Sequence, residues 1–231
     1  MRNDPDAVML FAAGFGTRMG KLTKNRPKPL IKVAGRALFD HALEQVDGAR
    51  ISHKVTNCHY FPDQIRAHLS TRPDVHVVTE SGAILETGGG LKNALPVLGN
   101  QPVFTMNTDA VWCGPNALEF VKSKWKPDQM DALLLCVSRK SAIGHTGAGD
   151  FIYGENNTIS YGPGDVFTGL QIIKTDRLSE ITDTSFSLKL LWEKMFEVNR
   201  VFGVQYPGHW CDVGSPEGIE SAEQMLDVTD V

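Results

Sequence analysis

Short apolar runs alternate with segments of helical periodicity along most of this chain. Residues 7–12 form an apolar run of the length of a buried strand, and similar runs recur through the first half. The strands predicted there are residues 7–12, 54–57, 75–79, 103–107 and 132–137, and the helices are residues 38–46, 62–69, 91–95 and 116–124. This alternation is typical of an α/β fold with a parallel sheet.

The second half has a different pattern. Residues 151–161 predict a hairpin around Glu155-Asn156-Asn157, which is a small antiparallel insertion at the carboxyl side of the sheet. A buried strand over 169–173, a helix over 187–198, a strand over 201–206 and a terminal helix over 216–226 follow. We therefore expect one domain over residues 1–231, Rossmann-like and doubly wound around a mostly parallel sheet, with halves at about 1–138 and 139–231.

Composition supports one globular unit and excludes some partners. The chain has 231 residues, of which 42% are hydrophobic and 22% charged, enough for a sizeable core. Its formal net charge of −4 gives no basic field for nucleic acid or an anionic membrane. The first apolar run is short and follows Asp4-Pro5-Asp6, so we expect neither a signal peptide nor a membrane span and predict a cytoplasmic protein.

The cysteines and histidines give no metal or redox motif. The four cysteines are isolated and lack paired C-x-x-C spacing, so we expect reduced thiols in or near the core. The seven histidines are scattered, and His53 and His59 have no carboxylate partner at ligand spacing. A histidine metal site is therefore disfavoured.

The most informative segment follows the first predicted strand. It reads Phe-Ala-Ala-Gly-Phe-Gly-Thr-Arg-Met over residues 11–19, with Pro-Lys-Pro-Leu at 27–30. Gly14 and Gly16 allow positive φ and close approach of the backbone, so that main-chain N–H groups can face a nucleotide. Arg18 and Lys28 can then neutralise phosphate charge.

Two familiar phosphate loops do not fit this segment. The dinucleotide fingerprint Gly-x-Gly-x-x-Gly has Met19 at its third glycine position, with Gly20 one residue too late. A Walker A loop requires Ser or Thr after Gly-Lys, but Gly20-Lys21 precedes Leu22. These mismatches disfavour a dehydrogenase and a P-loop kinase.

Carboxylates follow two later segments that should end on the ligand side of the sheet. Asp109 comes directly after the strand over 103–107, and Asp212 lies in a predicted turn just before the terminal helix. Ligands of open α/β sheets bind outside the carboxyl ends of the strands. Because Mg²⁺ is held by one or two carboxylates together with substrate phosphates, the pair is a candidate Mg²⁺ site.

Together these motifs resemble the sugar nucleotidyltransferases that use nucleoside triphosphates. That family has a strand followed by Ala-Gly-x-Gly-Thr-Arg-Met, then Pro-Lys-Pro-Leu, and near its end Trp-x-Asp-x-Gly-Thr-Pro-Glu, which here has Ser215 in place of threonine. The resemblance implies a nucleotide-binding first half, a sugar-binding second half, Arg18 and Lys28 as catalytic residues, and Asp109 and Asp212 as the metal pair. It also implies nucleotide contacts from Ala13, Gly14, Gly16 and Thr17.

Further motifs narrow the resemblance to the N-acetylmuramate-1-phosphate uridylyltransferases of peptidoglycan recycling. They are Leu-Glu-Thr-Gly-Gly-Gly at 85–90, Gly-Asp-Phe at 149–151 and Phe-Thr-Gly at 167–169. We expect Gly88 and Gly89 to approach a pyrimidine, and Glu80, which ends a strand, to accept the N3–H of uracil. Candidate sugar-binding residues are Asn107, Asp150, Thr168 and Gly169.

The expected reaction is transfer of a uridylyl group from UTP to a sugar 1-phosphate, which releases pyrophosphate. Many hexose-1-phosphate relatives carry Glu-Lys-Pro after the hairpin, whereas this chain has Tyr161-Gly162-Pro163-Gly164. Two alternatives stay open, a glucose- or mannose-1-phosphate nucleotidyltransferase that uses another triphosphate, and a non-catalytic nucleotide-sugar sensor. Beyond its two substrates, UTP and the sugar 1-phosphate, we expect neither nucleic acid nor a membrane as a partner, and a monomer or weak oligomer.

Overall fold

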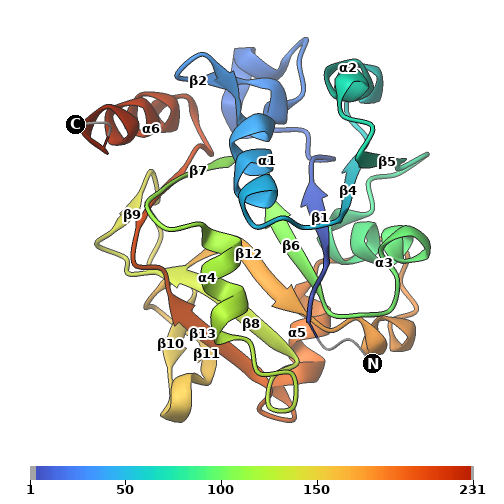
Figure 1. The fold of residues 1–231 in the computed structure, drawn as a ribbon, viewed down its shortest axis with the longest axis vertical. Helices are drawn as coiled ribbons and strands as arrows, with labels where there is room; N and C mark the ends of the chain where they lie inside the picture. Colours follow the sequence, from blue (N-terminus) through green and yellow to red (C-terminus); the bar gives the residue numbers. More distant parts are fainter. Residues whose placement is uncertain (1–3, 230–231) are drawn as a thin grey trace.

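A seven-stranded sheet forms the centre of the computed structural model, which describes residues 4–229 (Figure 1). Its order is β13-β8-β12-β6-β1-β4-β5, and every neighbouring pair is parallel except the two that involve β12. The bounds are β13 Val201–Gln205, β8 Ala132–Val137, β12 Val166–Ile173, β6 Val103–Asn107, β1 Ala7–Phe11, β4 His53–Cys58 and β5 Val75–Thr79. The predicted α/β fold with a mostly parallel sheet is confirmed.

Helices cover both faces of this sheet, which explains why its central strands β1, β6 and β8 are almost entirely buried. Helices α1 (Leu38–Gly48) and α4 (Ala117–Lys124) share one hydrophobic cluster with Val8 and Leu10 of β1. Helices α3 (Glu86–Leu98) and α5 (Lys189–Phe196) share the other cluster with Met9. Alternate residues of β1 thus enter opposite halves of the core. Helix α2 (Pro62–His68) connects β4 to β5.

A second, three-stranded sheet lies beside the first and was not predicted. It consists of β7 (Ala110–Cys113), β14 (His209–Asp212) and β9 (Ala142–Ile143), and α6 (Pro216–Thr229) packs on it. Asp212 therefore ends a strand, not a turn as predicted. The short strands β2 (Lys32–Val33) and β3 (Arg36–Ala37) form a further antiparallel pair.

Other predictions hold with shifted boundaries. The hairpin is present as β10 (Phe151–Tyr153) and β11 (Ile159–Tyr161), with Asn156 and Asn157 at positive φ in the turn. The triglycine lies inside α3 and does not precede the helix as predicted, and the segment at 184–186 packs directly against Gly88 and Gly89. The N–H groups of Gly88 and Gly89 both donate to the Phe186 carbonyl, at 2.8 and 3.1 Å.

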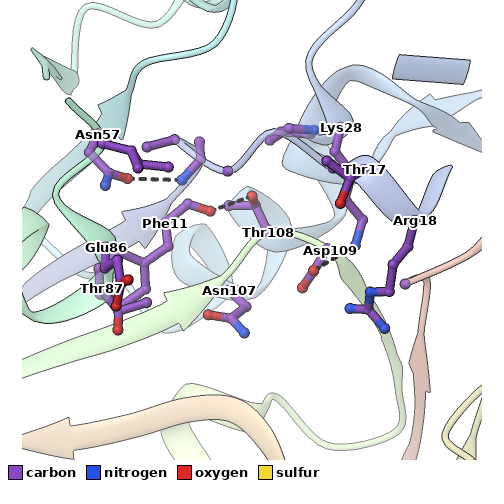
Figure 2. Close-up of a pocket in the computed structure, with 17 residues that line it drawn as sticks. Phe11, Thr17, Arg18, Lys28, Asn57, Glu86, Thr87, Asn107, Thr108 and Asp109 are labelled. Atoms are coloured by element: carbon purple, nitrogen blue, oxygen red, sulfur yellow. Dashed lines mark hydrogen bonds and ion pairs between the residues drawn. The ribbon is translucent and has the colours of Figure 1, made fainter. Parts of the chain in front are cut away.

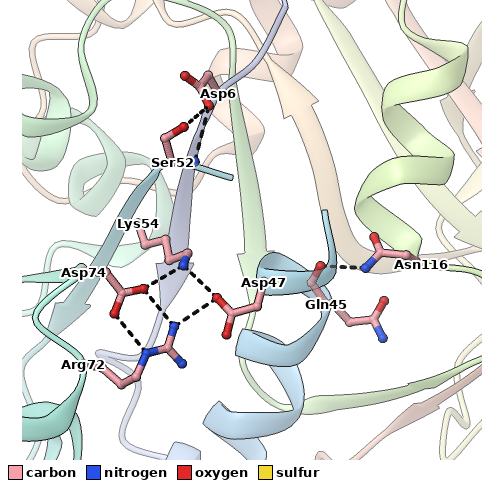
Figure 3. A network of polar contacts seen from close by, with 8 residues as sticks. All are labelled: Asp6, Gln45, Asp47, Ser52, Lys54, Arg72, Asp74 and Asn116. Atoms are coloured by element: carbon pink, nitrogen blue, oxygen red, sulfur yellow. Dashed lines mark hydrogen bonds and ion pairs between the residues drawn. The ribbon is translucent and has the colours of Figure 1, made fainter. Parts of the chain in front are cut away.

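A polar network joins α1, β4 and the turn before β5 at the edge of the sheet (Figure 3). The Lys54 ammonium lies 2.7 Å from carboxylate oxygens of both Asp47 and Asp74, and Arg72 contacts the same two carboxylates at 3.0 and 2.9 Å. Hydrogen bonds from Arg72 and then from Lys54 hold the pKa of the Asp74 carboxyl well below its usual range. The folded state therefore favours ionised Asp74.

This network predicts an acid-dependent contribution to stability. A carboxyl with a lowered pKa in the folded state stabilises the protein above its unfolded pKa, and that contribution is lost as the pH falls. We expect Asp74→Asn to lower the free energy of unfolding by about 1 kcal/mol or less at pH 7, since these side chains are solvent-screened. Thermal melts should show the deficit shrinking below about pH 4. If Asp74→Asn is destabilised equally at pH 3 and pH 7, the ionised Asp74 carboxylate does not stabilise the folded state.

Within residues 4–229, no helix is long and apolar enough to cross a membrane. The cysteines Cys58, Cys113, Cys136 and Cys211 are free thiols.

Candidate active site

The loop after β1 forms one wall of a cavity of about 300 Å³ at the carboxyl ends of β1, β4 and β6 (Figure 2). Gly16 adopts a φ of 63°, and a Cβ atom there would lie 2.8 Å from Cβ of Lys28. Gly14 does not have positive φ, in contrast to the prediction, and a Cβ atom there would meet open space. The predicted nucleotide residues that line the cavity are Ala13, Gly14, Gly16 and Thr17.

Lys28 reaches this cavity from a short 3₁₀ turn, Lys28–Leu30. The residue is only 7% exposed, and its ammonium lies 2.7 Å from Oδ2 of Asp109. Pro27 and Pro29 restrict the backbone on either side. A buried ammonium with its stem packed against Gly16 is therefore held where phosphate groups would enter.

Asp109 comes directly before β7 and Asp212 ends the neighbouring strand β14, although the two residues are distant in sequence. In the β7–β14 pair, Asp212 is opposite Ala110, and the Val213 N–H donates to the Asp109 carbonyl at 2.9 Å. Burial, and next the charge of Asp109, raise the pKa of the Asp212 carboxyl above its usual value; Lys28, Arg18 and His145 oppose that shift. The two carboxylates predicted as a metal pair are thus brought together and repel each other.

This pair has the chemistry expected of a Mg²⁺ site that is completed by substrate. A dication between the two carboxylates would remove their repulsion, and carboxylate oxygens are ligands that Mg²⁺ prefers. Among the described residues, no third Asp, Glu, His or Cys joins them in a metal-binding group. The remaining ligands would therefore be phosphate oxygens and water.

Arg18 is exposed and lines the cavity next to Gly214. A Cβ atom on Gly214 would lie 2.8 Å from both a guanidinium nitrogen of Arg18 and Oδ2 of Asp212. The missing side chain at this position leaves room for a cation and a carboxylate side by side. Arg18 therefore joins Lys28 and the two aspartates at one end of the site.

A second cavity, of about 600 Å³, continues on the side of β12 and the hairpin. Arg18, Asn107 and Asp109 line both cavities, so the two spaces are contiguous. The predicted sugar-binding residues Asn107, Asp150 and Thr168 line the second cavity. Together the cavities offer neighbouring places for two substrates, with Asp109 lining both and Asp212 lining the second.

Some of these polar groups are already engaged in the fold. The Thr168 hydroxyl donates to the Leu135 carbonyl at 2.6 Å, and the Asp150 carboxylate accepts the N–H of Phe167 at 2.9 Å. Gly169 sits in a β-bulge of β12 with a φ of 84°, and a Cβ atom there would lie 2.6 Å from Nδ2 of Asn107. Gly169 does not line the cavity; it leaves space for Asn107.

Three residues predicted to contact the base do not line either cavity. Glu80 is 3% exposed, and its carboxylate accepts hydrogen bonds from Nδ2 of Asn57 at 2.6 Å and from the Leu85 N–H at 2.9 Å. Gly88 and Gly89 are buried in α3 against the segment at 184–186. The structure therefore gives Glu80 a positioning role and the two glycines a packing role.

Asn57 is the residue that connects Glu80 to the site. It is the penultimate residue of β4 and lines the first cavity, and its Oδ1 accepts the N–H of Ala12 at 2.9 Å (Figure 2). The chain Ala12–Asn57–Glu80–Leu85 thus ties the glycine loop to the loop before α3. The strand-end rule that singled out Asp109 would also have found Asn57.

We expect Glu80→Gln to destabilise the protein without changing base preference. The amide nitrogen of glutamine cannot accept the Leu85 N–H, so one buried hydrogen bond is lost at a cost of about 1–3 kcal/mol in unfolding free energy. Denaturant unfolding and relative turnover of UTP and CTP measure the two effects. A change in the UTP-to-CTP ratio with unaltered stability would restore the predicted contact between Glu80 and uracil.

Further lining residues were missed because their signals are weak in a single sequence. In the second cavity these include His145, Lys189 and Trp192, and in the first they include Thr87 and Thr108. The Thr108 hydroxyl donates to the Phe11 carbonyl at 2.7 Å and closes the end of β1 (Figure 2). Only Thr108 follows a predicted strand directly.

Comparison with solved structures confirms the fold. The crystal structure of HddC from Yersinia pseudotuberculosis superposes with a TM-score of 0.78 at 19% identity, over 95% of this chain and 99% of that one. The inositol-1-phosphate CTP transferase of T. maritima gives 0.77 at 17% identity, over 98% of both chains.

Sequence comparison gives relatives that match over nearly the full length. N-acetylmuramate alpha-1-phosphate uridylyltransferase of Caulobacter vibrioides is 36% identical over 98% of this chain and 99% of its own. The protein of that name from Neisseria meningitidis serogroup B is 29% identical over 94% of this chain and 97% of its own. The model of the MobA-like NTP transferase domain matches residues 8–156. With a glycine loop, a buried lysine and a carboxylate pair at one sheet edge, this chain belongs to the MobA-like NTP transferase family.

Proposed function

We propose that this protein catalyses transfer of the uridylyl group of UTP to N-acetylmuramic acid 1-phosphate. The single observation that carries the proposal is the 36% identity, over almost the whole of both chains, to an enzyme named for this reaction. The site supports it because two contiguous cavities share Arg18, Asn107 and Asp109, with Lys28 in the first cavity and Asp212 in the second. The first cavity would hold UTP, and the second the sugar.

The reaction needs positioning and charge neutralisation more than a strong base. A phosphate oxygen of the sugar 1-phosphate attacks the α-phosphorus of UTP, the new phosphorus–oxygen bond forms, and the α–β anhydride bond breaks with its electron pair leaving on pyrophosphate. The attacking phosphate is already ionised at neutral pH. The protein lowers the barrier by holding both phosphates in line and by placing positive charge where negative charge develops.

Each cation of the site has a distinct place in this scheme. Lys28, which lines the first cavity and is buried beside Asp109, would contact the α-phosphate of UTP. Arg18, exposed at the rim, would contact the departing pyrophosphate. Asp109 and Asp212 would hold a Mg²⁺ ion, which supplies further positive charge at the reacting phosphates when bound.

A screen of pyrophosphate release tests the proposal directly. UTP, CTP, GTP and dTTP are each combined with the 1-phosphates of N-acetylmuramic acid, N-acetylglucosamine, glucose and mannose, in the presence of Mg²⁺. We expect UTP with N-acetylmuramic acid 1-phosphate to give the highest kcat/KM. Preference for glucose 1-phosphate with dTTP, or for mannose 1-phosphate with GTP, would contradict the substrate assignment while leaving nucleotidyl transfer in place. No turnover with any pair would favour a sensor.

A further inference from the structure

Lys189 is a cation of the second cavity that the proposed reaction does not use. It is exposed at the first position of α5 and lines the cavity together with Trp192. Across residues 4–229, no carboxylate forms an ion pair with its ammonium, whereas Lys28 and the lysines of the surface networks are paired. The charge is therefore available to a ligand.

The backbone that carries Lys189 is firmly held. Just before it, the Leu188 N–H donates to the Thr87 hydroxyl at 3.0 Å, and the Ser185 hydroxyl donates to the Ile84 carbonyl at 2.8 Å. Trp192 lies three residues further on, on the same face of α5, and its indole N–H donates to Gln171 at 2.9 Å. The position of Lys189 at the cavity edge is thus fixed by α3 and by the core.

Lys189 approaches the cavity from a different side than the phosphate-binding groups. Asp212 belongs to the sheet of β7, β9 and β14, and the cations that act on it are Lys28, Arg18 and His145. Helix α5 instead packs against α3 and β13, away from β9 and α6 (Figure 1). A sugar 1-phosphate with its phosphate at Asp109 and Asp212 would therefore direct its ring substituents towards α5.

We propose that Lys189 binds a carboxylate substituent of the sugar and thereby selects N-acetylmuramic acid 1-phosphate. This inference rests on the proposed function. The lactyl ether of N-acetylmuramic acid carries a carboxylate that N-acetylglucosamine lacks, and an unpaired ammonium is the complementary group. A neutral hexose would leave the Lys189 charge without a partner, so the same residue contributes to affinity and to discrimination.

The test compares the sugar substrate with its lactyl amide, which has nearly the same shape but no negative charge. Both compounds are assayed with UTP by pyrophosphate release, for the wild type, Lys189→Ala and Lys189→Arg. We expect the wild type to prefer the acid, and the acid-to-amide ratio of kcat/KM to fall about tenfold in Lys189→Ala. Lys189→Arg should keep most of the preference. Lys140→Ala, which removes an exposed lysine that lines neither cavity, is the control and should keep the wild-type ratio.

The outcomes separate this inference from the proposed function. If the wild type uses neither compound, the proposed function fails. If the wild type uses the acid and the amide equally well, Lys189 does not recognise the carboxylate, and the inference is overturned without any variant. If the wild type prefers the acid and Lys189→Ala keeps that preference, the inference is overturned while the proposed function stands. Equal losses for acid and amide would assign Lys189 to the shared phosphate instead, and would also overturn it.

Discussion

Replacement of Lys28 by alanine is expected to lower kcat by roughly 10²–10³, the loss typical for one preorganised charge donor at a reacting centre. The Lys28 side chain is 9% exposed and its ammonium lies 2.7 Å from Asp109, so the positive charge acts at a place that solvent hardly reaches. The fold should survive, because Asp109 is 29% exposed and can be solvated after its partner is removed.

The measurement is initial-rate kinetics of pyrophosphate release, accompanied by a thermal melt. Lys32→Ala serves as the matched control, since Lys32 is an exposed lysine on the short strand β2 and lines neither cavity. Near-normal turnover in Lys28→Ala would refute a role for the ammonium in catalysis. A loss that is confined to KM would assign Lys28 to ground-state binding of UTP.

Asp109→Asn and Asp212→Asn are each expected to abolish Mg²⁺-dependent turnover. Both substitutions keep the volume of the side chain and remove one of two neighbouring negative charges that would hold the cation. Because groups that act as one unit are not additive, the double mutant should be scarcely slower than either single mutant. If the loss of turnover in the double mutant equals the product of the two single losses, the two carboxylates act separately.

Stability provides an independent check on the same pair. The raised pKa of the Asp212 carboxyl means that its ionised form is disfavoured in the folded protein, first by burial and then by Asp109. The contribution of the Asp212 carboxyl to the free energy of unfolding is therefore greatest at low pH and declines as the pH rises towards neutrality. Asp212→Asn should unfold at a temperature at or above that of the wild type at pH 7. A marked drop would point to a structural role for the Asp212 carboxylate.

Local patterns predicted β1, β6 and β8 well because these strands are buried on both faces. The strands β1 and β6 are recognisable from their own apolar residues, and Asp109 comes two residues after the end of β6. The sheet of β7, β9 and β14 lacked such evidence, since these strands are two to four residues long. The antiparallel direction of β12 depends on pairing with distant strands, which no local pattern records.

The site shows the same division between local and distant information. Asn57 lies near the end of β4 and Glu80 directly follows the neighbouring strand β5, so either residue could reach the cavity by the strand-end rule. Gly90 of α3 leaves room for the Asn57–Glu80 hydrogen bond, because a Cβ atom there would lie 2.8 Å from Nδ2 of Asn57 and 2.9 Å from Oε1 of Glu80. Glu80 is buried and Asn57 lines the cavity, and no local pattern in the sequence records their contact with a helix that follows both strands.

The three glycines of α3 exclude side chains for three different reasons. A Cβ atom on Gly88 would lie 2.4 Å from the ring of Phe186, one on Gly89 would lie 2.3 Å from the Thr184 carbonyl, and one on Gly90 would meet Asn57 and Glu80. Gly88 and Gly89 are therefore required by the segment at 184–186, and Gly90 by the Asn57–Glu80 pair. A search that uses this triplet as a marker of uracil recognition would instead detect how closely α3 packs on its neighbours.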